Sequence, residues 1–190
     1  FVSRRGDHGF VGIWSGADRP IVWLAPSTGF DGAPVWSPDG RRVAFTRLPG
    51  AGGAPEPMLT EAPRPWSIVV ADAATGEGKA VWQSPRTANG SYPGAIADGA
   101  ALMWGARDRL VFRAELDGWP HLYSLPAAGG EPLLLTPGNF MVEHTAMSRD
   151  RATLLYGANT GVAAEDDDRR HLFRVPIDRA APVAVTRGEG

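Results

Sequence analysis

The feature that most constrains the fold of this chain is a repeat of short apolar segments separated by turn residues. The 24 glycines and 17 prolines lie between runs rich in Val, Leu, Ile, Phe, Trp and Tyr, and helical periodicity is nearly absent. This spacing is typical of short β-strands joined by tight turns. We therefore expect an all-β fold without long helices.

The clearest copy of the repeat opens at residues 34–40 (PVWSPDG). Three further strand-like runs follow it, at residues 41–48, 67–72 and 79–83. The letters S-P-D-G suit a tight turn, and the alternation of side chains over 43–46 gives the second run one apolar face. These four strands in succession are expected to form one antiparallel sheet.

Two later segments, 101–136 and 143–186, carry the same four parts, and residues 1–32 supply three more strand-like runs. Equivalent residues such as His121 and His171 lie about 50 residues apart. Spacings of roughly 40 to 50 residues are typical of the four-stranded blade of a β-propeller. We therefore expect a partial β-propeller of about four blades. The expected boundaries are an incomplete blade at 1–32 and blades at 33–85, 99–138 and 142–188.

A ring of blades normally closes with four to eight members, so a partial ring leaves sheet edges and apolar faces uncovered. The chain starts at Phe1 without a methionine and enters a strand at once, which leads us to expect a piece of a longer polypeptide. We expect the uncovered faces to be occupied by another copy of the chain or by the remainder of that polypeptide. A homo-oligomer is thus one expected partner.

Composition excludes several classes of partner. The chain has 19 Lys and Arg against 21 Asp and Glu, a net charge of -2, so no broad positive field is available for nucleic acid. No apolar run approaches the roughly 18 residues that span a bilayer, and we expect no membrane partner. The absence of cysteine excludes disulfides, thiolate metal sites and cysteine nucleophiles, but leaves the compartment open with a lean to the cytoplasm.

Several motifs resemble those of one peptidase family. The segment 36–45 (WSPDGRRVAF) is similar to an element of TolB-like propellers and of the N-terminal propeller of prolyl oligopeptidase family serine peptidases. The segment 115–123 (ELDGWPHLY) resembles the D-G-W-x-H-L-Y segment of the dipeptidyl peptidase IV and acylaminoacyl-peptidase branches. It is followed by 135–143 (LTPGNFMVE), which is similar to the next segment of those proteins, and 170–175 resembles the following blade.

The resemblance implies a non-catalytic propeller that caps an α/β-hydrolase domain, gates the entry of peptide substrates and forms part of their cavity. In that family the nucleophile lies in a G-x-S-x-G turn of the C-terminal hydrolase domain, and no serine of this chain has that pair of flanking glycines. The chain alone is therefore expected not to be an enzyme, although its parent is expected to be a serine peptidase. Because no two glutamates are adjacent, dipeptidyl peptidase specificity is not carried over. The alternative is a stand-alone TolB-like module that binds a protein.

No catalytic, metal or cofactor residue is predicted. The histidines His121 and His171 occur at the same repeat position, before a Leu, which favours a packing role over catalysis. The acidic run 165–168 lacks the alternate spacing of a calcium loop and reads as a solvated turn beside two arginines.

Three residues are predicted to bind substrate: Trp119, Met58 and Leu59. Trp119 belongs to a turn rather than to an alternating strand, whereas Trp36 and Trp104 recur at the first strand of the repeat and are expected in the core. Met58 and Leu59 form an apolar pair in the Pro- and Gly-rich loop 48–65. That loop suits a cover for a cavity or for a neighbouring subunit, with a flexible linker as the alternative.

Overall fold

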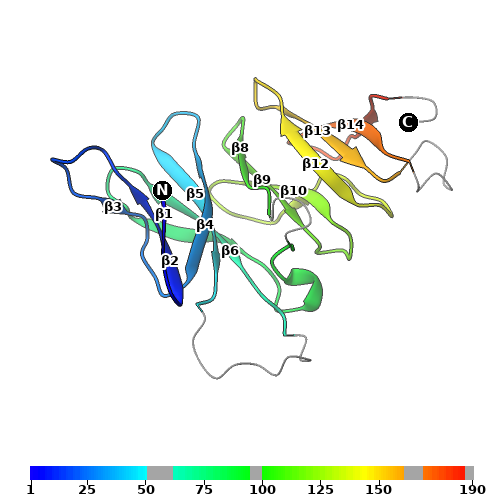
Figure 1. The fold of residues 1–190 in the computed structure, drawn as a ribbon. Helices are drawn as coiled ribbons and strands as arrows, with labels where there is room; N and C mark the ends of the chain where they lie inside the picture. The colour runs from blue at the N-terminus through cyan, green and yellow to red at the C-terminus, as the bar shows by residue number, and fades with distance from the viewer. Residues whose placement is uncertain (51–61, 95–99, 161–168, 187–190) are drawn as a thin grey trace. The chain divides into compact units, whose positions relative to one another are not determined.

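The computed structural model describes residues 1–50, 62–94, 100–160 and 169–186 of the 190-residue chain (Figure 1). The described part consists of β-strands and connecting turns, with one short 3-10 turn, η1 (Ala88–Gly90). The expectation of an all-β fold built from antiparallel four-stranded sheets is confirmed. Among these residues no helix has the length and apolar character needed to cross a membrane. The chain divides into two compact units, Phe1–Tyr92 and Pro93–Gly190.

The first unit holds one sheet in the order β1-β2-β4-β5-β6-β7, with β3 paired to β2. Neighbouring strands are antiparallel except at β2 and β4, which meet in a parallel bridge between Gly9 and Phe30. Residues 1–32, expected as an incomplete blade, thus reach the following sheet through that bridge. The strands are β1 (Val2–Arg5), β2 (His8–Ile13), β3 (Val22–Trp23), β4 (Phe30–Trp36), β5 (Arg42–Leu48), β6 (Ser67–Asp72) and β7 (Gly78–Gln83).

The core of the first unit forms where β1–β3 pack against β4–β7. Val11 and Leu24 supply one side, and the other side consists of Val43, Phe45 and residues of β6. All of these side chains are at most 2% exposed. The alternation expected over 43–46 therefore places Val43 and Phe45 on one buried face.

The second unit holds two four-stranded antiparallel sheets, in the orders β11-β10-β9-β8 and β12-β13-β14-β15. Each sheet follows the chain strand by strand, as in the sequence repeat. The strands of the first sheet are β8 (Met103–Gly105), β9 (Arg109–Ala114), β10 (His121–Pro126) and β11 (Leu133–Leu134). Those of the second, which we call the last sheet, are β12 (Val142–Met147), β13 (Thr153–Ala158), β14 (His171–Pro176) and β15 (Val183–Ala184).

The core of the second unit lies between these two sheets. The β8–β11 sheet contributes Val111, Leu122 and Leu135, all fully buried, and the last sheet contributes Leu154 and Tyr156 together with its other buried apolar residues. At about 25 cal/mol per Å² of buried apolar surface, contacts of this kind supply most of the stability of the unit. Sheet-on-sheet packing between successive repeats is thus the organising contact of the fold.

The two tryptophans expected in the core behave differently. Trp104 on β8 is 2% exposed, as expected, but Trp36 at the end of β4 is 48% exposed, so the expectation for Trp36 was wrong. The register of β4 against β5 shifts between Gly32 and Val35, and the end of β4 pairs only with β5. A shift in register changes which side chains face the core, which local alternation alone cannot reveal.

Candidate functional site

A cavity of about 560 Å³ opens in the second unit beside the start of β12. Residues from five parts of the chain line it: the segment 93–94, the end of β9, the turn before β10, the start of β12 and the residue before β14. They combine apolar side chains with charged ones. The lining residues are Pro93, Gly94, Arg113, Glu115, Pro120, Met141, Val142, Glu143, His144 and Arg170.

A β-bulge in β12 brings two adjacent polar residues of that strand to this cavity. Val142 pairs with Ala158 and His144 pairs with Gly157, so Glu143 is the extra residue between them. In a regular strand, adjacent side chains point to opposite faces, and a bulge breaks that alternation. Glu143 and His144 consequently both line the cavity, and Val142 beside them also borders it while packing in the core at 1% exposure.

The charges of the cavity are mixed. The guanidinium of Arg170 makes a bidentate contact with Glu143: Nε lies 3.2 Å from both carboxylate oxygens, and Nη2 lies 2.9 Å from Oε1. Arg113, which is 4% exposed on β9, donates from Nη1 to the backbone carbonyl of Glu143 at 3.5 Å. Both arginines therefore converge on the bulged residue.

This lining can bind but holds no nucleophile of the usual kind. Among the described residues that line it there is no Ser, Thr, Cys or Lys, so a hydroxyl, thiol or amine nucleophile is absent from that part of the lining. Carboxylates can accept hydrogen bonds from an amine, and guanidinium groups can donate to a carboxylate or a carbonyl. In the described ranges no group of three or more His, Asp and Glu side chains could hold a metal ion. The arrangement suits a ligand with groups of both polarities.

Trp119, predicted to bind substrate, lies in the turn before β10 and is 37% exposed. It does not line the cavity itself, but the next residue, Pro120, does. The turn is held by Asp117, whose Oδ1 accepts from the backbone N–H of Trp119 at 3.4 Å and from the Tyr123 hydroxyl at 3.2 Å. A substrate role for Trp119 stays a prediction, and Met58 and Leu59 lie outside the described residues.

The histidines of the repeat are structural. His121 and His171 are at most 1% exposed, at the starts of β10 and β14. After each histidine, the backbone N–H of a leucine donates to a threonine hydroxyl: Leu122 to Thr136 at 3.0 Å and Leu172 to Thr186 at 2.9 Å. The same bond in both sheets shows that the two histidines occupy equivalent positions of the repeat.

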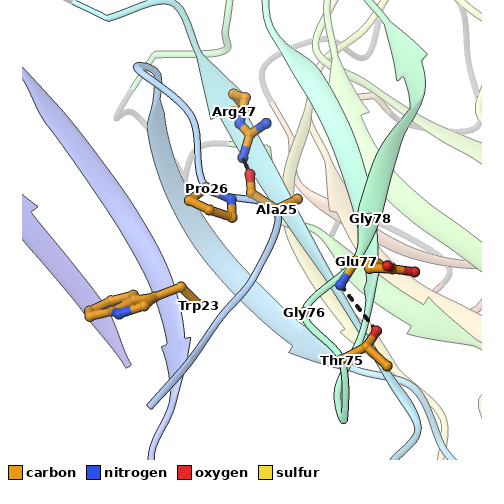
Figure 2. A pocket seen from close by; sticks show the side chains of 8 residues that line it. All are labelled: Trp23, Ala25, Pro26, Arg47, Thr75, Gly76, Glu77 and Gly78. Atoms are coloured by element: carbon orange, nitrogen blue, oxygen red, sulfur yellow. Dashed lines mark hydrogen bonds between the residues drawn. The ribbon is translucent and has the colours of Figure 1, made fainter. Parts of the chain in front are cut away.

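A second hollow lies in the first unit, and Figure 2 shows Arg47 above it with Trp23, Pro26 and the turn at residues 75–78. The guanidinium of Arg47 forms an ion pair with Asp31. Its Nε and Nη2 atoms lie 2.6 and 2.8 Å from the two carboxylate oxygens of Asp31. The side chain of Asp31 is fully buried. Burial raises the pKa of Asp31, although the hydrogen bond and charge of Arg47 oppose that effect. This hollow is therefore built around a structural ion pair.

Sequence reasoning did not assign the charged residues of the cavity, namely Arg113, Glu115, Glu143 and Arg170, to a site. One signal for Arg113 was available, because it interrupts the otherwise apolar run 110–114 of a strand whose neighbours are all buried. A buried charged side chain needs hydrogen-bonding or ionic partners. A buried arginine at the end of a strand therefore indicates a candidate binding site there. For Glu143 no local signal exists, since the bulge depends on the pairing with β13.

The four-stranded repeats and the sheet-on-sheet cores define a propeller-type β-sheet protein. Residues 65–190 match the family described as the dipeptidyl peptidase IV (DPP IV) N-terminal region. The chain therefore belongs to this family, as the resemblance of its motifs predicted. Comparison with curated proteins finds no matching sequence.

Solved structures of similar fold include an oligogalacturonate lyase in complex with manganese, at a TM-score of 0.61 and 12% identity over 95% of this chain and 50% of that one. TolB from Acinetobacter baumannii matches at a TM-score of 0.52 and 13% identity, over 94% of this chain and 37% of that one. A puromycin-hydrolyzing peptidase of Mycobacterium tuberculosis matches at a TM-score of 0.53 and 14% identity, over 99% and 30%. The chain thus spans half or less of these proteins, and the likeness concerns the fold.

Proposed function

We propose that this chain is a non-catalytic propeller segment of a prolyl oligopeptidase-type serine peptidase. In this proposal the segment gates and binds peptide substrates, and a C-terminal α/β-hydrolase domain supplies the nucleophile. The observation that carries the proposal is the cavity beside β12, in a chain of the DPP IV N-terminal family. Its described lining offers charged groups of both signs and no hydroxyl, thiol or amine nucleophile, which suits a domain that binds a substrate while another domain supplies the nucleophile.

The chemistry of a short peptide fits this lining. A peptide carries an ammonium group, a carboxylate and a series of amides, so it needs acceptors and donors in one place. Glu115 and Glu143 can accept from the ammonium group, and Arg113 and Arg170 can donate to carbonyl or carboxylate oxygens. Pro120, Met141 and Val142 provide apolar surface for side chains. Charged pairs of this kind are worth more where water is partly excluded.

The second candidate is a stand-alone TolB-like module that binds a protein partner. The match to TolB over 94% of this chain favours it, because the fold alone does not require a hydrolase domain. The reading frame in the genome separates the two candidates. A frame that continues into an α/β region with a G-x-S-x-G motif supports the peptidase, and a frame without such a region supports the binding module.

Peptide binding is tested directly on the purified chain by isothermal titration calorimetry with trialanine, N-acetyl-trialanine and trialanine amide. We expect trialanine to bind in the micromolar to millimolar range typical of small ligands, and each capped form to bind more weakly. Arg170→Gln removes the guanidinium that is proposed to donate to the peptide, together with its contact to Glu143. This variant should therefore bind trialanine several-fold more weakly than the wild type. The matched control is Arg19→Gln, an exposed arginine of the first unit, which should bind as the wild type does.

The outcomes are distinguishable. If Arg170→Gln binds each of the three peptides as tightly as the wild type does, the cavity is not where the peptide binds. No heat of binding for any peptide at millimolar concentration, with the chain folded by circular dichroism, would overturn peptide binding by this segment. The reading-frame test stands apart from both results.

A further inference from the structure

The carboxylates at the cavity beside β12 differ in what they contact. Glu115 and Glu143 line the cavity, and Asp117 lies in the turn that follows Glu115. One oxygen of Asp117 lies 2.8 Å from Nδ1 of His121, and the other accepts from the Tyr123 hydroxyl at 3.2 Å. Both oxygens of Asp117 are therefore engaged within the turn, and this carboxylate is not available to a ligand.

The carboxylate of Glu143 is also engaged. It is held by both Nε and Nη2 of Arg170, and the Glu143 side chain is only 20% exposed. A bidentate guanidinium contact of this kind compensates the negative charge and fixes the direction of the carboxylate. A cationic group of a ligand would have to share Glu143 with Arg170 or displace it.

Glu115 is the carboxylate of this lining that has no such partner. Within residues 1–50, 62–94, 100–160 and 169–186, no basic side chain forms an ion pair with it. Arg113, two residues earlier, is directed to the backbone carbonyl of Glu143 instead. Glu115 is half-buried, and its backbone is fixed because its carbonyl accepts from the N–H of Gly118 at 2.8 Å. A half-buried carboxylate without a cation favours a ligand that supplies one.

Apolar surface lines the same cavity as Glu115. Pro93, Pro120 and Met141 belong to this lining. Two of its walls are joined, because the backbone N–H of Val142 donates to the carbonyl of Pro120 at 2.8 Å. A lysine side chain has an apolar stem and a charged end, so it can pack its stem on such surface while its ammonium group meets an acceptor. The amino terminus of a peptide carries the same charge without that stem.

We propose that the cavity selects peptides by a primary ammonium group that binds Glu115. This inference rests on the proposed function, because it takes the ligand to be a peptide. It assigns different roles to the two carboxylates of the lining: Glu115 binds the cation of the ligand, and Glu143 orients Arg170. The ammonium group can belong to a lysine side chain or to the amino terminus, and the apolar lining favours the lysine side chain.

The test measures dissociation constants by isothermal titration calorimetry on the purified full chain with three capped tripeptides. N-acetyl-Ala-Lys-Ala amide and N-acetyl-Ala-norleucine-Ala amide share a four-carbon side-chain stem, and only the first carries an ammonium group. We expect the lysine peptide to bind about tenfold more tightly, which is the order expected of a hydrogen bond to a charged group. Ala-norleucine-Ala amide carries its ammonium group at the amino terminus alone. Tighter binding of this third peptide than of the lysine peptide would identify the amino terminus as the group at Glu115.

Three variants assign the preference to a residue. Glu115→Gln keeps the shape of the side chain and removes its charge, so it should bind the charged and uncharged peptides equally. Glu143→Gln breaks the contact with Arg170, so it should change the affinity for all three peptides but still prefer a charged one. Glu131→Gln, at an exposed glutamate of the same unit, is the matched control and should show the wild-type preference.

The possible results separate this inference from the proposed function. A wild type that binds all three peptides equally tightly would overturn the role of Glu115 and leave peptide binding intact. A preference for the ammonium group that persists in Glu115→Gln, or that is lost in Glu143→Gln, would also overturn it. Failure of the folded wild type to bind any peptide would overturn both. The comparison of peptides on the wild type needs no variant, so it decides the question even if Glu115→Gln does not fold.

Discussion

His121 Nδ1 lies 2.8 Å from Oδ2 of Asp117, and this contact closes the turn that carries Trp119. His121 is fully buried, and because an ionised carboxylate can only accept, its Nδ1–H is assigned as the donor to Asp117, which anchors the turn to the start of β10. The other oxygen of Asp117 accepts from the Tyr123 hydroxyl. The spacing of Asp, His and Tyr in residues 117–123 is thus explained by one carboxylate with three donors.

Removal of the Asp117 carboxylate should destabilise the second unit. Asp117→Ala leaves the buried His121 ring nitrogen and the Tyr123 hydroxyl without this acceptor, and the expected loss is about 1–3 kcal/mol of unfolding free energy. Urea denaturation followed by circular dichroism measures it. Glu131→Ala, at an exposed position of the same unit, is the control and should change stability by less than about 0.5 kcal/mol. Equal stability of the two variants would show that the turn does not depend on this carboxylate.

Local patterns predicted the turns of the fold well, because each turn is built from residues close in sequence. Ser37 donates to Asp39 at 2.6 Å, and Ser148 donates to Asp150 at 2.6 Å, so the two turns assigned to the same repeat position have the same bonds. In both turns the serine hydroxyl also accepts from a backbone N–H five residues later. Such side-chain to backbone bonds are encoded within a few residues.

Features that depend on pairing between distant strands were not predictable in the same way. The bulge at Glu143 arises from the register of β12 against β13, and the exposure of Trp36 arises from the register of β4 against β5. The parallel bridge between Gly9 and Phe30 likewise joins segments whose local patterns do not specify each other. Of these features, only the bulge at Glu143 shapes the cavity, so the sequence predicted the cavity's neighbour Trp119 but not its charged lining.

The two Ser-Asp turns predict how stability depends on pH. The serine hydroxyl, followed by a backbone N–H, lowers the pKa of Asp39 and of Asp150 below the ordinary value of 3.8. A carboxyl whose folded pKa is lowered contributes stability that is complete above its unfolded pKa and is lost as pH falls through the folded value. We therefore expect the urea concentration at the unfolding midpoint to decrease as the pH is lowered below 3.8. The decrease should be less steep in the double variant Asp39→Asn, Asp150→Asn. An unchanged slope in that variant would contradict the assignment.

The ion pair between Arg47 and Asp31 should be costly to break. Asp31→Ala leaves the guanidinium, which is 22% exposed, without its carboxylate, and removal of one partner of a buried pair costs about 3–5 kcal/mol. Partial hydration of Arg47 places the expected loss near the lower end of that range. Thermal and urea unfolding measure it. Asp7→Ala, which removes a largely exposed partner of His8, is the matched control and should leave the free energy of unfolding almost unchanged. Similar losses in both variants would argue against a special role for the pair.

Gly40 allows the turn before β5 to adopt a left-handed conformation. Its φ is 69°, and a Cβ built there would meet no atom within 4 Å, so any cost of Gly40→Ala comes from the backbone. We expect a loss of about 1–2 kcal/mol. Gly94→Ala, which likewise meets no atom within 4 Å and has no left-handed φ, is the control. A Gly40→Ala variant as stable as Gly94→Ala would mean that the turn relaxes without cost.

Trp119 should contribute to peptide binding rather than to stability. Its ring is 37% exposed on a turn whose next residue, Pro120, lines the cavity, so it is placed to cover a bound peptide. An indole that packs on a ligand contributes through apolar contact and through its N–H. We expect Trp119→Ala to weaken trialanine binding several-fold while the urea midpoint stays within error of the wild type. Trp14→Ala, at a tryptophan of the first unit that is 64% exposed, is the matched control and should leave binding unchanged. If Trp119→Ala binds trialanine as tightly as Trp14→Ala does while Arg170→Gln binds it weakly, the cavity holds the peptide without Trp119. A fall in stability equal to the fall in affinity would instead make Trp119 a structural residue of its turn.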